Sequence, residues 1–97
     1  EITYNDAAKT LLSEKTNIEV LKKTYDLLNE SSFETKTLEE NFRNYSKEKD
    51  MKLANLVAPL RCSITGSNVS PSIFEVMEIL GKEITFERIE NSLKTFG

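Results

Sequence analysis

The stretch of sequence that most constrains the fold covers residues 59–83, because it holds both prolines of the chain and two of its three glycines. Within it, residues 65–72 (T-G-S-N-V-S-P-S) have the composition of a turn. Gly66 tolerates a positive φ, and Ser and Asn are common turn residues. We call residues 65–72 the elbow. The apolar runs on either side of the elbow predict one helix before it and a second helix after it.

The start of this second helix carries several signals. Ser70 is predicted to be the N-cap, and Pro71, which has no N–H to leave unpaired, is predicted at the first helical position. Val69 and Phe74 have the spacing of a hydrophobic staple across the helix start. The helix is expected to end at Gly81. Its apolar face consists of Ile73, Val76, Met77 and Leu80.

Apolar residues at helical spacing predict helices in the rest of the chain as well. The expected set is one short helix beginning near residue 6 and helices at residues 17–29, 38–49, 51–63, 70–80 and 82–95. No segment shows the alternation of apolar and polar residues that is typical of a β-strand. A chain of 97 residues has the size of one domain. We therefore expect a single all-α domain, residues 1–97, built as a bundle of about six short helices.

Local signals predict where some of these helices begin or are interrupted. Asn5 or Asp6 can cap the first helix, and T-x-x-E motifs that start at Thr16 and Thr37 are predicted to be capping boxes for the second and third. Pro59 lies inside the fourth apolar pattern, where its missing N–H and its ring disfavour a regular helix. We expect that helix to kink or to restart at Pro59.

The composition excludes several classes of function. The chain has no histidine and one cysteine, so it lacks the commonest general base and cannot form an internal disulfide or a multi-cysteine metal site. Cys62 is expected to be a packed thiol. No apolar run approaches the ~20 residues of a membrane span, and the N-terminus lacks the features of a secretory signal. These features predict a cytoplasmic protein that has no membrane partner.

The net charge of −3 argues mildly against binding to nucleic acid, because contacts of Lys and Arg with phosphate dominate such affinity. The charge is unevenly distributed along the chain. Residues 36–66 contain six basic and four acidic residues, whereas the segments on both sides of them are acidic. Because the basic segment leads into the elbow, this distribution favours the elbow as the place where RNA would bind.

Residues 59–83 resemble a known signature. The pattern P-L-R-x-x-x-T-G-x-x-x-S-P-x-[IL]-F-E-V-M-x-[IL]-L-G-K-E is similar to the C-terminal signature of bacterial glutamyl-tRNA synthetases, and looser similarity extends back through residues 38–56. The resemblance implies a compact, irregular cage of helices that binds the anticodon of a glutamate-accepting tRNA. It also implies that the chain is the C-terminal fragment of a longer enzyme, which attaches glutamate to tRNA. That parent enzyme is expected to use ATP and Mg, to be a monomer and to have no DNA partner.

The catalytic signatures of such an enzyme are not found in this chain. Class I synthetases carry motifs of the H-I-G-H and K-M-S-K-S types on a nucleotide-binding fold, and neither the motifs nor the fold pattern occurs here. We therefore assign no catalytic residue, metal ligand or cofactor to residues 1–97. Two other functions stay open, namely a free-standing helical protein-interaction module, which would suit the acidic net charge, and a domain that only stabilises a longer chain.

By this resemblance, the anticodon site combines the arginine of P-L-R with the start of the helix after the elbow. The residues carried over are Arg61, Ser70, Pro71, Ile73 and Phe74. The guanidinium of Arg61 can donate two hydrogen bonds to an unpaired base or can stack on it. The free N–H groups at a helix start attract phosphate or base acceptors, and Ile73 and Phe74 can give apolar or stacking contact with a base.

Structural interpretations of the same residues compete with this assignment. Arg61 can form a surface ion pair, for instance with Glu83 or Glu87, and the residues at the helix start can be only a cap, a staple and core. Three lysines of the basic segment can contact phosphate or can belong to a solvated face. These lysines are Lys47, Lys49 and Lys52.

Overall fold

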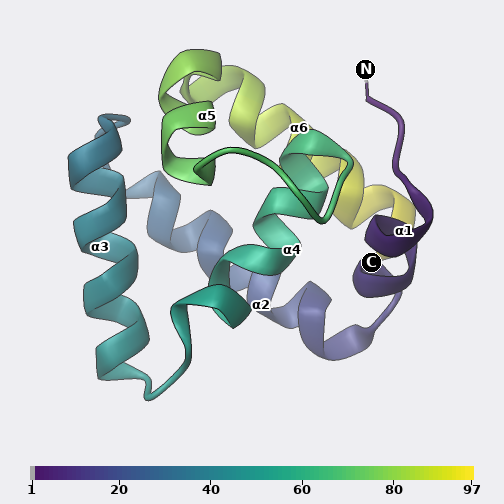
Figure 1. The fold of residues 1–97 in the computed structure, drawn as a ribbon, viewed down its shortest axis with the longest axis horizontal. Helices are drawn as coiled ribbons and strands as arrows, with labels where there is room; N and C mark the ends of the chain where they lie inside the picture. The colour runs from purple at the N-terminus through teal and green to yellow at the C-terminus, as the bar shows by residue number, and fades with distance from the viewer. Residues whose placement is uncertain (1) are drawn as a thin grey trace.

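Six α-helices form the secondary structure of residues 2–97, the part of the chain that the computed structural model describes (Figure 1). They are α1 (Asp6–Leu12), α2 (Lys15–Asn29), α3 (Thr35–Glu48), α4 (Leu53–Thr65), α5 (Ile73–Leu80) and α6 (Lys82–Phe96). No strand occurs within these described residues. The prediction of an all-α fold with about six short helices is confirmed.

Helix α4 lies in the middle of the molecule and packs against each of the other five helices (Figure 1). Its sequence accounts for this position, because an apolar helix is stable only where neighbours cover it on several sides. The buried residues of α4 are Leu56, Val57, Pro59, Leu60, Cys62, Ser63 and Ile64. The helices therefore surround α4 in an irregular arrangement, and the elbow begins at the C-terminal end of this central helix.

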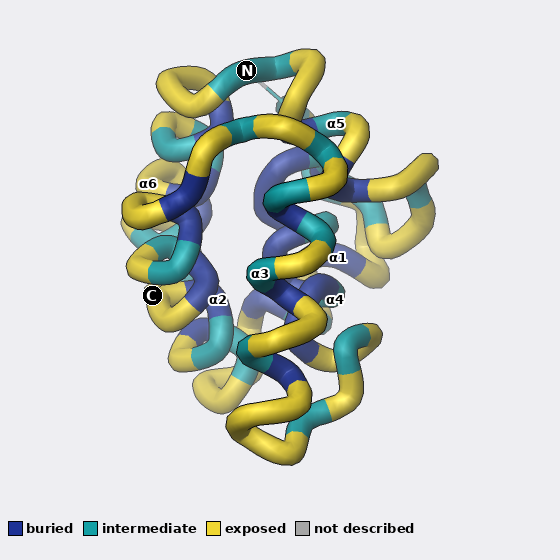
Figure 2. Tube along the Cα trace, turned by 90° about the vertical axis from the view of Figure 1, so that its left-hand side faces the viewer, coloured by how far each residue is buried: buried dark blue, intermediate teal, exposed yellow. Residues whose placement is uncertain are grey.

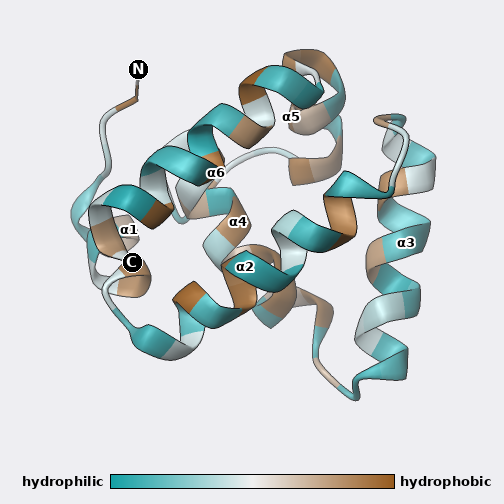
Figure 3. Cartoon of the chain, turned by 180° about the vertical axis from the view of Figure 1, so that it is seen from behind, coloured by the Kyte–Doolittle hydropathy of each residue, from teal (hydrophilic) through white to brown (hydrophobic). Residues whose placement is uncertain are grey.

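The surrounding helices are amphipathic. Buried and exposed positions alternate along α3 in Figure 2, and hydrophobic residues recur between hydrophilic ones along α2 in Figure 3. Phe42 of α3 packs against Phe74 of α5 with 5.4 Å between ring centroids. On the other side of the molecule, Tyr25 of α2 donates a hydrogen bond of 2.6 Å to Glu90 of α6. Both contacts join helices that are far apart in the sequence, the first within the core and the second at the surface.

Pro59 does not interrupt α4, which is helical from Leu53 to Thr65, so the predicted restart does not occur. A proline in a helix leaves the carbonyl of the residue four positions earlier without its N–H partner. Here that residue is Asn55, which is exposed, so water can bind its carbonyl. Pro59 itself is buried among the neighbouring helices. The packing of α4 therefore offsets the missing hydrogen bond.

The predicted starts of α1, α2 and α3 have different outcomes. Asn5 caps α1 as expected, because its side-chain oxygen accepts a hydrogen bond of 2.8 Å from the backbone N–H of Ala8. The prediction of capping boxes at Thr16 and Thr37 is wrong. Helices α2 and α3 begin earlier, with Glu14 and Glu34 at their N-caps, and neither N-cap side chain makes a capping bond. The T-x-x-E motifs therefore lie inside the helices.

A side chain from another helix replaces the local cap at the start of α3. Glu78 of α5 accepts a hydrogen bond of 2.8 Å from the backbone N–H of Thr35 and a further, short one from the Thr35 hydroxyl. A carboxylate at this position also interacts favourably with the positive end of the helix dipole. The cap of α3 is thus a long-range contact, which explains why a local motif did not predict it.

Among the described residues, no helix is both long enough and apolar enough to span a membrane.

Candidate nucleic-acid interface

The elbow has a fixed conformation that depends on Gly66. Gly66 has a φ of +77°, in the left-handed region, and its N–H donates a hydrogen bond of 2.9 Å to the carbonyl of Cys62 at the end of α4. A Cβ atom at this position would collide with the backbone carbonyl of Thr3. Both the backbone angle and the lack of space therefore require glycine here.

Thr65 closes the first part of the elbow. Its hydroxyl donates a hydrogen bond of 2.8 Å to the carbonyl of Arg61 and accepts one of 3.1 Å from the backbone N–H of Ser67. The Ser67 hydroxyl in turn accepts a hydrogen bond of 3.0 Å from the backbone N–H of Val69. These contacts, together with Gly66, set the conformation of the first part of the elbow.

The structure brings Arg61 and Ser70 together across the elbow. The Nε of Arg61, which is half-buried at its place on α4, donates a hydrogen bond of 2.9 Å to the Ser70 hydroxyl. The Ser70 hydroxyl donates one of 2.7 Å to the carbonyl of Pro71. Within residues 2–97, neither Nη of Arg61 has a hydrogen-bond or ion-pair partner, Glu83 and Glu87 included. The surface ion pair with Glu83 or Glu87, offered as an alternative for Arg61, is therefore not formed in this part of the chain.

The start of α5 differs from the prediction. Ser72, not Ser70, is the N-cap, and its hydroxyl accepts a hydrogen bond of 3.5 Å from the backbone N–H of Glu75. Ser70 lies two residues before this N-cap, and its hydroxyl bonds to Arg61 and to the carbonyl of Pro71 instead. Pro71 consequently lies before the helix, where it is exposed, rather than in its first turn.

The prediction of a hydrophobic staple between Val69 and Phe74 is also wrong. Val69 is 74% exposed, so it does not pack against Phe74, which is 7% exposed. Phe74 instead faces the interior against Phe42, and Ile73 is 1% exposed. Ile73 and Phe74 therefore anchor the start of α5 in the core, whereas Arg61, Ser70 and Pro71 lie at or near the surface.

The three predicted phosphate-binding lysines lie elsewhere, around the link between α3 and α4 (Figure 1). Lys47 is in the last turn of α3, Lys49 is its C-cap and Lys52 is the N-cap of α4, and all three are exposed. The 13 residues of α4 separate this link from the elbow by about 20 Å at 1.5 Å per residue. The structure thus divides the predicted site residues into two groups.

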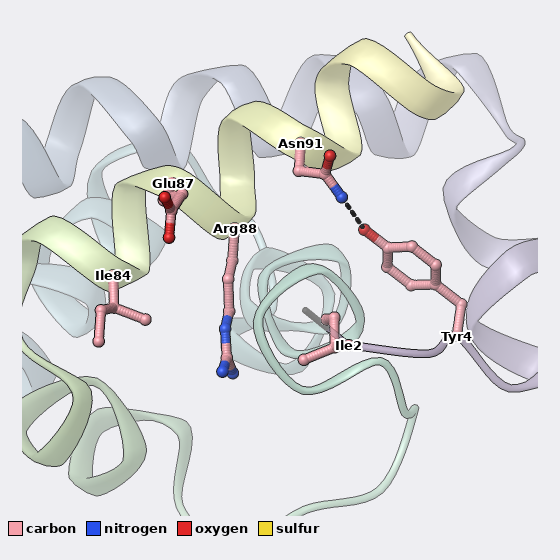
Figure 4. A pocket seen from close by; sticks show the side chains of 6 residues that line it. All are labelled: Ile2, Tyr4, Ile84, Glu87, Arg88 and Asn91. Carbon is pink, nitrogen blue, oxygen red and sulfur yellow. Dashed lines mark hydrogen bonds between the residues drawn. The ribbon is translucent and has the colours of Figure 1, made fainter.

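A cavity of about 470 Å³ lies between the N-terminal segment and α6 (Figure 4). It is lined by Ile2, Tyr4, Ile84, Glu87, Arg88 and Asn91. Arg88 donates a hydrogen bond of 2.8 Å to the carbonyl of Ile64, near the C-terminal end of α4, where a positive charge complements the helix dipole. The lining contains one acidic and one basic side chain, so it has no charge preference. We assign this cavity no ligand.

Cys62 is fully buried beside the elbow. Burial raises the pKa of the Cys62 thiol, and the positive charge of Arg61 offsets only part of this effect. A raised pKa leaves little thiolate at neutral pH, so Cys62 is a packed side chain rather than a nucleophile. The described residues also contain no group of three His, Cys, Asp or Glu side chains that could hold a metal ion.

Sequence reasoning missed the contribution of residues 2–5 to the elbow. This segment precedes α1 and lies beside Gly66, with which Asn5 shares a backbone hydrogen bond of 2.7 Å. From the sequence, Asn5 is predicted only as a cap for α1. Its contact with the elbow joins residues more than 60 positions apart in the sequence, and no local pattern indicates such a contact.

A family model described as "Anticodon binding domain" matches residues 1–93. Glutamate–tRNA ligase 1 of Campylobacter hominis is 39% identical over 92 residues, which are 95% of this chain and 20% of that protein. Glutamate–tRNA ligase 2 of Rickettsia akari is 36% identical over 90 residues, which are 92% of this chain and 19% of that protein. The chain thus spans about a fifth of the length of these relatives.

A solved structure has the same fold. The crystal structure of a glutamate tRNA ligase from Elizabethkingia meningosepticum, in complex with its amino acid, superposes with a TM-score of 0.87 at 20% identity. The superposition covers 98% of this chain and 19% of that one. At this identity the likeness establishes the arrangement of the helices.

Proposed function

The chain belongs to the anticodon-binding domain family, and on that premise we propose that it recognises the anticodon of a glutamate-accepting tRNA as part of a glutamate–tRNA ligase. Residues 1–97 would form a single anticodon-binding domain at the C-terminal end of this longer, monomeric, cytoplasmic enzyme. The activation of glutamate with ATP and Mg, and its transfer to tRNA, would belong to the rest of the parent chain. The enzyme would bind tRNA and would have no DNA partner.

The observation that carries this proposal is that Arg61 is held at the elbow through its Nε while both of its Nη groups have no partner among residues 2–97. Its Nε is bound to the Ser70 hydroxyl at 2.9 Å, which fixes the plane of the guanidinium. Both Nη groups are free of partners among residues 2–97. A guanidinium held in this way offers two parallel donors, and anticodon bases are unpaired and present their edges to such donors. Arg61 is thus suited to bind a base edge.

Ser70 and Pro71 complete the proposed surface. The Ser70 hydroxyl accepts a hydrogen bond from Arg61 and donates one to the carbonyl of Pro71. Pro71 is exposed next to them and can pack against the face of a base. Ile73 and Phe74 remain part of the proposed site in a different role. Because both are buried, they hold the start of α5, and with it the elbow, in place rather than offering a surface for stacking.

The experiment that tests the proposal is an NMR titration of the chain with the anticodon stem-loop of a glutamate tRNA and with a stem-loop whose anticodon is exchanged. We expect the cognate RNA to shift the signals of Arg61 and the elbow. The Arg61→Ala variant should lose on the order of 1–3 kcal/mol of binding free energy and most of the discrimination between the two RNAs.

A charge-matched control is Arg43→Ala. Arg43 is exposed on α3, where it forms an ion pair of 2.8 Å with Glu39, so its replacement removes the same charge far from the elbow in sequence. This variant should keep the discrimination between anticodons. Equal shifts with both RNAs, or shifts confined to residues 1–35, would contradict anticodon recognition and would favour a protein-interaction module instead.

A further inference from the structure

Asn5 is bound to α1 and to the elbow at the same time. Its Oδ1 accepts a hydrogen bond of 2.8 Å from Ala8 N–H, and its backbone N–H donates one of 2.7 Å to the carbonyl of Gly66. Its Nδ2 donates to the Ser67 hydroxyl at 3.2 Å and to the Oδ1 of Asn68 at 3.4 Å. The residue therefore contacts three consecutive residues of the elbow in addition to the helix that it caps.

We infer that Asn5 is a positioning residue for the elbow, which it holds in the conformation that presents Arg61. The inference rests on the proposed function, because it assigns Asn5 a part in anticodon binding without contact to RNA. Asn5 is suited to this part by the chemistry of its side chain. The amide has an acceptor for the N-cap and two donors for the elbow, whereas Ser, Thr and Asp, the other good N-caps, lack the amide donors.

A short series of hydrogen bonds and adjacent residues links the contact between Asn5 and Ser67 to Arg61. The Ser67 hydroxyl accepts from Asn5 Nδ2 and from the backbone N–H of Val69. The next residue, Ser70, accepts from Arg61 Nε at 2.9 Å. If Asn5 Nδ2 is removed, the Ser67 hydroxyl loses one of the partners that orient it, and the segment that carries Ser70 is held less firmly.

The expected effect is modest. The Asn5 contacts with Ser67 and Asn68 are exposed to solvent, and such neutral hydrogen bonds contribute little net free energy. Loss of these contacts should reduce the affinity for the cognate stem-loop by roughly threefold to tenfold.

The discriminating variant is Asn5→Ser. Serine caps a helix about as well as asparagine, and the backbone hydrogen bond to Gly66 does not involve the side chain, so only the amide donors are lost. The matched control is Asn41→Ser, which removes a similar contact on α3, where Asn41 Nδ2 donates to the Ser31 hydroxyl at 2.9 Å.

Two readouts separate this inference from the proposed function. The first needs no RNA: in Asn5→Ser, the amide protons of Ser67 and Val69 should exchange several times faster, while the amide of Ala8 and the midpoint of urea unfolding stay close to those of the wild type. The second is the affinity for the cognate stem-loop, which should fall in Asn5→Ser and not in Asn41→Ser. Ser67→Ala should lower the affinity to a similar extent, and the double variant should lose less than the sum of the two.

Each outcome decides one of the two claims. Unchanged exchange at the elbow in Asn5→Ser would overturn the inference, whatever the RNA does. Faster exchange with unchanged RNA affinity would also overturn it, provided that Arg61→Ala still weakens binding. If the wild-type chain binds no stem-loop, the proposed function fails together with the role of Asn5 in RNA binding.

Discussion

Gly66 is the residue on which the shape of the elbow depends most directly. Gly66→Ala would place a Cβ against the carbonyl of Thr3 and would force alanine into a φ of +77°. The left-handed conformation alone costs a non-glycine residue about 1–2 kcal/mol, so the variant should lose about 2 kcal/mol or more of unfolding free energy in urea. Residues 2–5 should also move, which amide chemical shifts will detect.

Gly81 offers a control for this variant. Its φ is +87°, so Gly81→Ala should also lower the unfolding free energy, by about 1–3 kcal/mol. A Cβ at Gly81 meets no atom within 4 Å, however, so this variant should leave the signals of residues 2–5 unchanged. If Gly66→Ala leaves them unchanged as well, the contact between the elbow and the N-terminal segment is not what requires glycine.

At the same scale, the sequence identifies residues better than it assigns their contacts. Arg61, Ser70 and Gly66 are recognisable from the motif, because their spacing belongs to a distinctive pattern. The sequence predicts Ser70 as the N-cap of α5, but Ser72 is the N-cap, since both are serines near the same helix start and either can act as a cap. The structure decides between them, because the Ser72 hydroxyl accepts from the backbone N–H of Glu75, whereas the Ser70 hydroxyl accepts from Arg61 at 2.9 Å.

At the scale of the helices, the contact between α5 and α3 makes a prediction about pH. The Glu78 carboxylate accepts hydrogen bonds from the hydroxyl and from the backbone N–H of Thr35, and these hold the pKa of Glu78 below its usual value of 4.5. Because the pKa is lower in the folded chain than in the unfolded chain, the stabilisation is complete above the usual value and is lost as the pH falls through the folded value.

Urea unfolding at a series of pH values between about 3 and 6 measures this effect. The loss of unfolding free energy on acidification should be smaller in Glu78→Gln than in the wild type, because glutamine does not titrate. Glu75→Gln is the matched control on the same helix, since among residues 2–97 the Glu75 carboxylate accepts no hydrogen bond. Equal acid dependence in Glu78→Gln and the wild type would contradict a role of the Glu78 charge at the start of α3.

The same contact explains which parts of the helices could be predicted. The existence and order of all six helices follow from apolar residues at helical spacing, which the local sequence contains. The starts of α2 and α3 do not follow from it. At α3, the cap comes from Glu78, 43 positions after Thr35, and this contact favours a start two residues before the T-x-x-E motif. The continuity of α4 through Pro59 likewise depends on burial by other helices.

At the scale of the whole molecule, the two groups of proposed RNA contacts are expected to act differently. The elbow carries the single guanidinium of Arg61, whereas the link between α3 and α4 carries the three link lysines, Lys47, Lys49 and Lys52. The molecule measures 30 × 28 × 21 Å, so one anticodon stem-loop can contact the elbow and the link together only if it extends over the surface in the direction of α4, from one end of this helix to the other. In that arrangement the link would meet the phosphate backbone and the elbow would meet bases.

Replacing the three link lysines with alanine should therefore weaken binding without changing which anticodon is preferred. Each phosphate contact that is lost reduces the slope of log affinity against log salt by about 0.7–0.9, so the slope should fall by about 2 if most of these lysines contact phosphate. Affinities measured at several salt concentrations, for both cognate and exchanged anticodons, give the slope and the discrimination together. A control with the same change in net charge replaces Lys9, Lys15 and Lys23, and it should keep the wild-type slope. An unchanged slope in the link variant would restrict the RNA contact to the elbow, because lysines that bind no phosphate release no counterions.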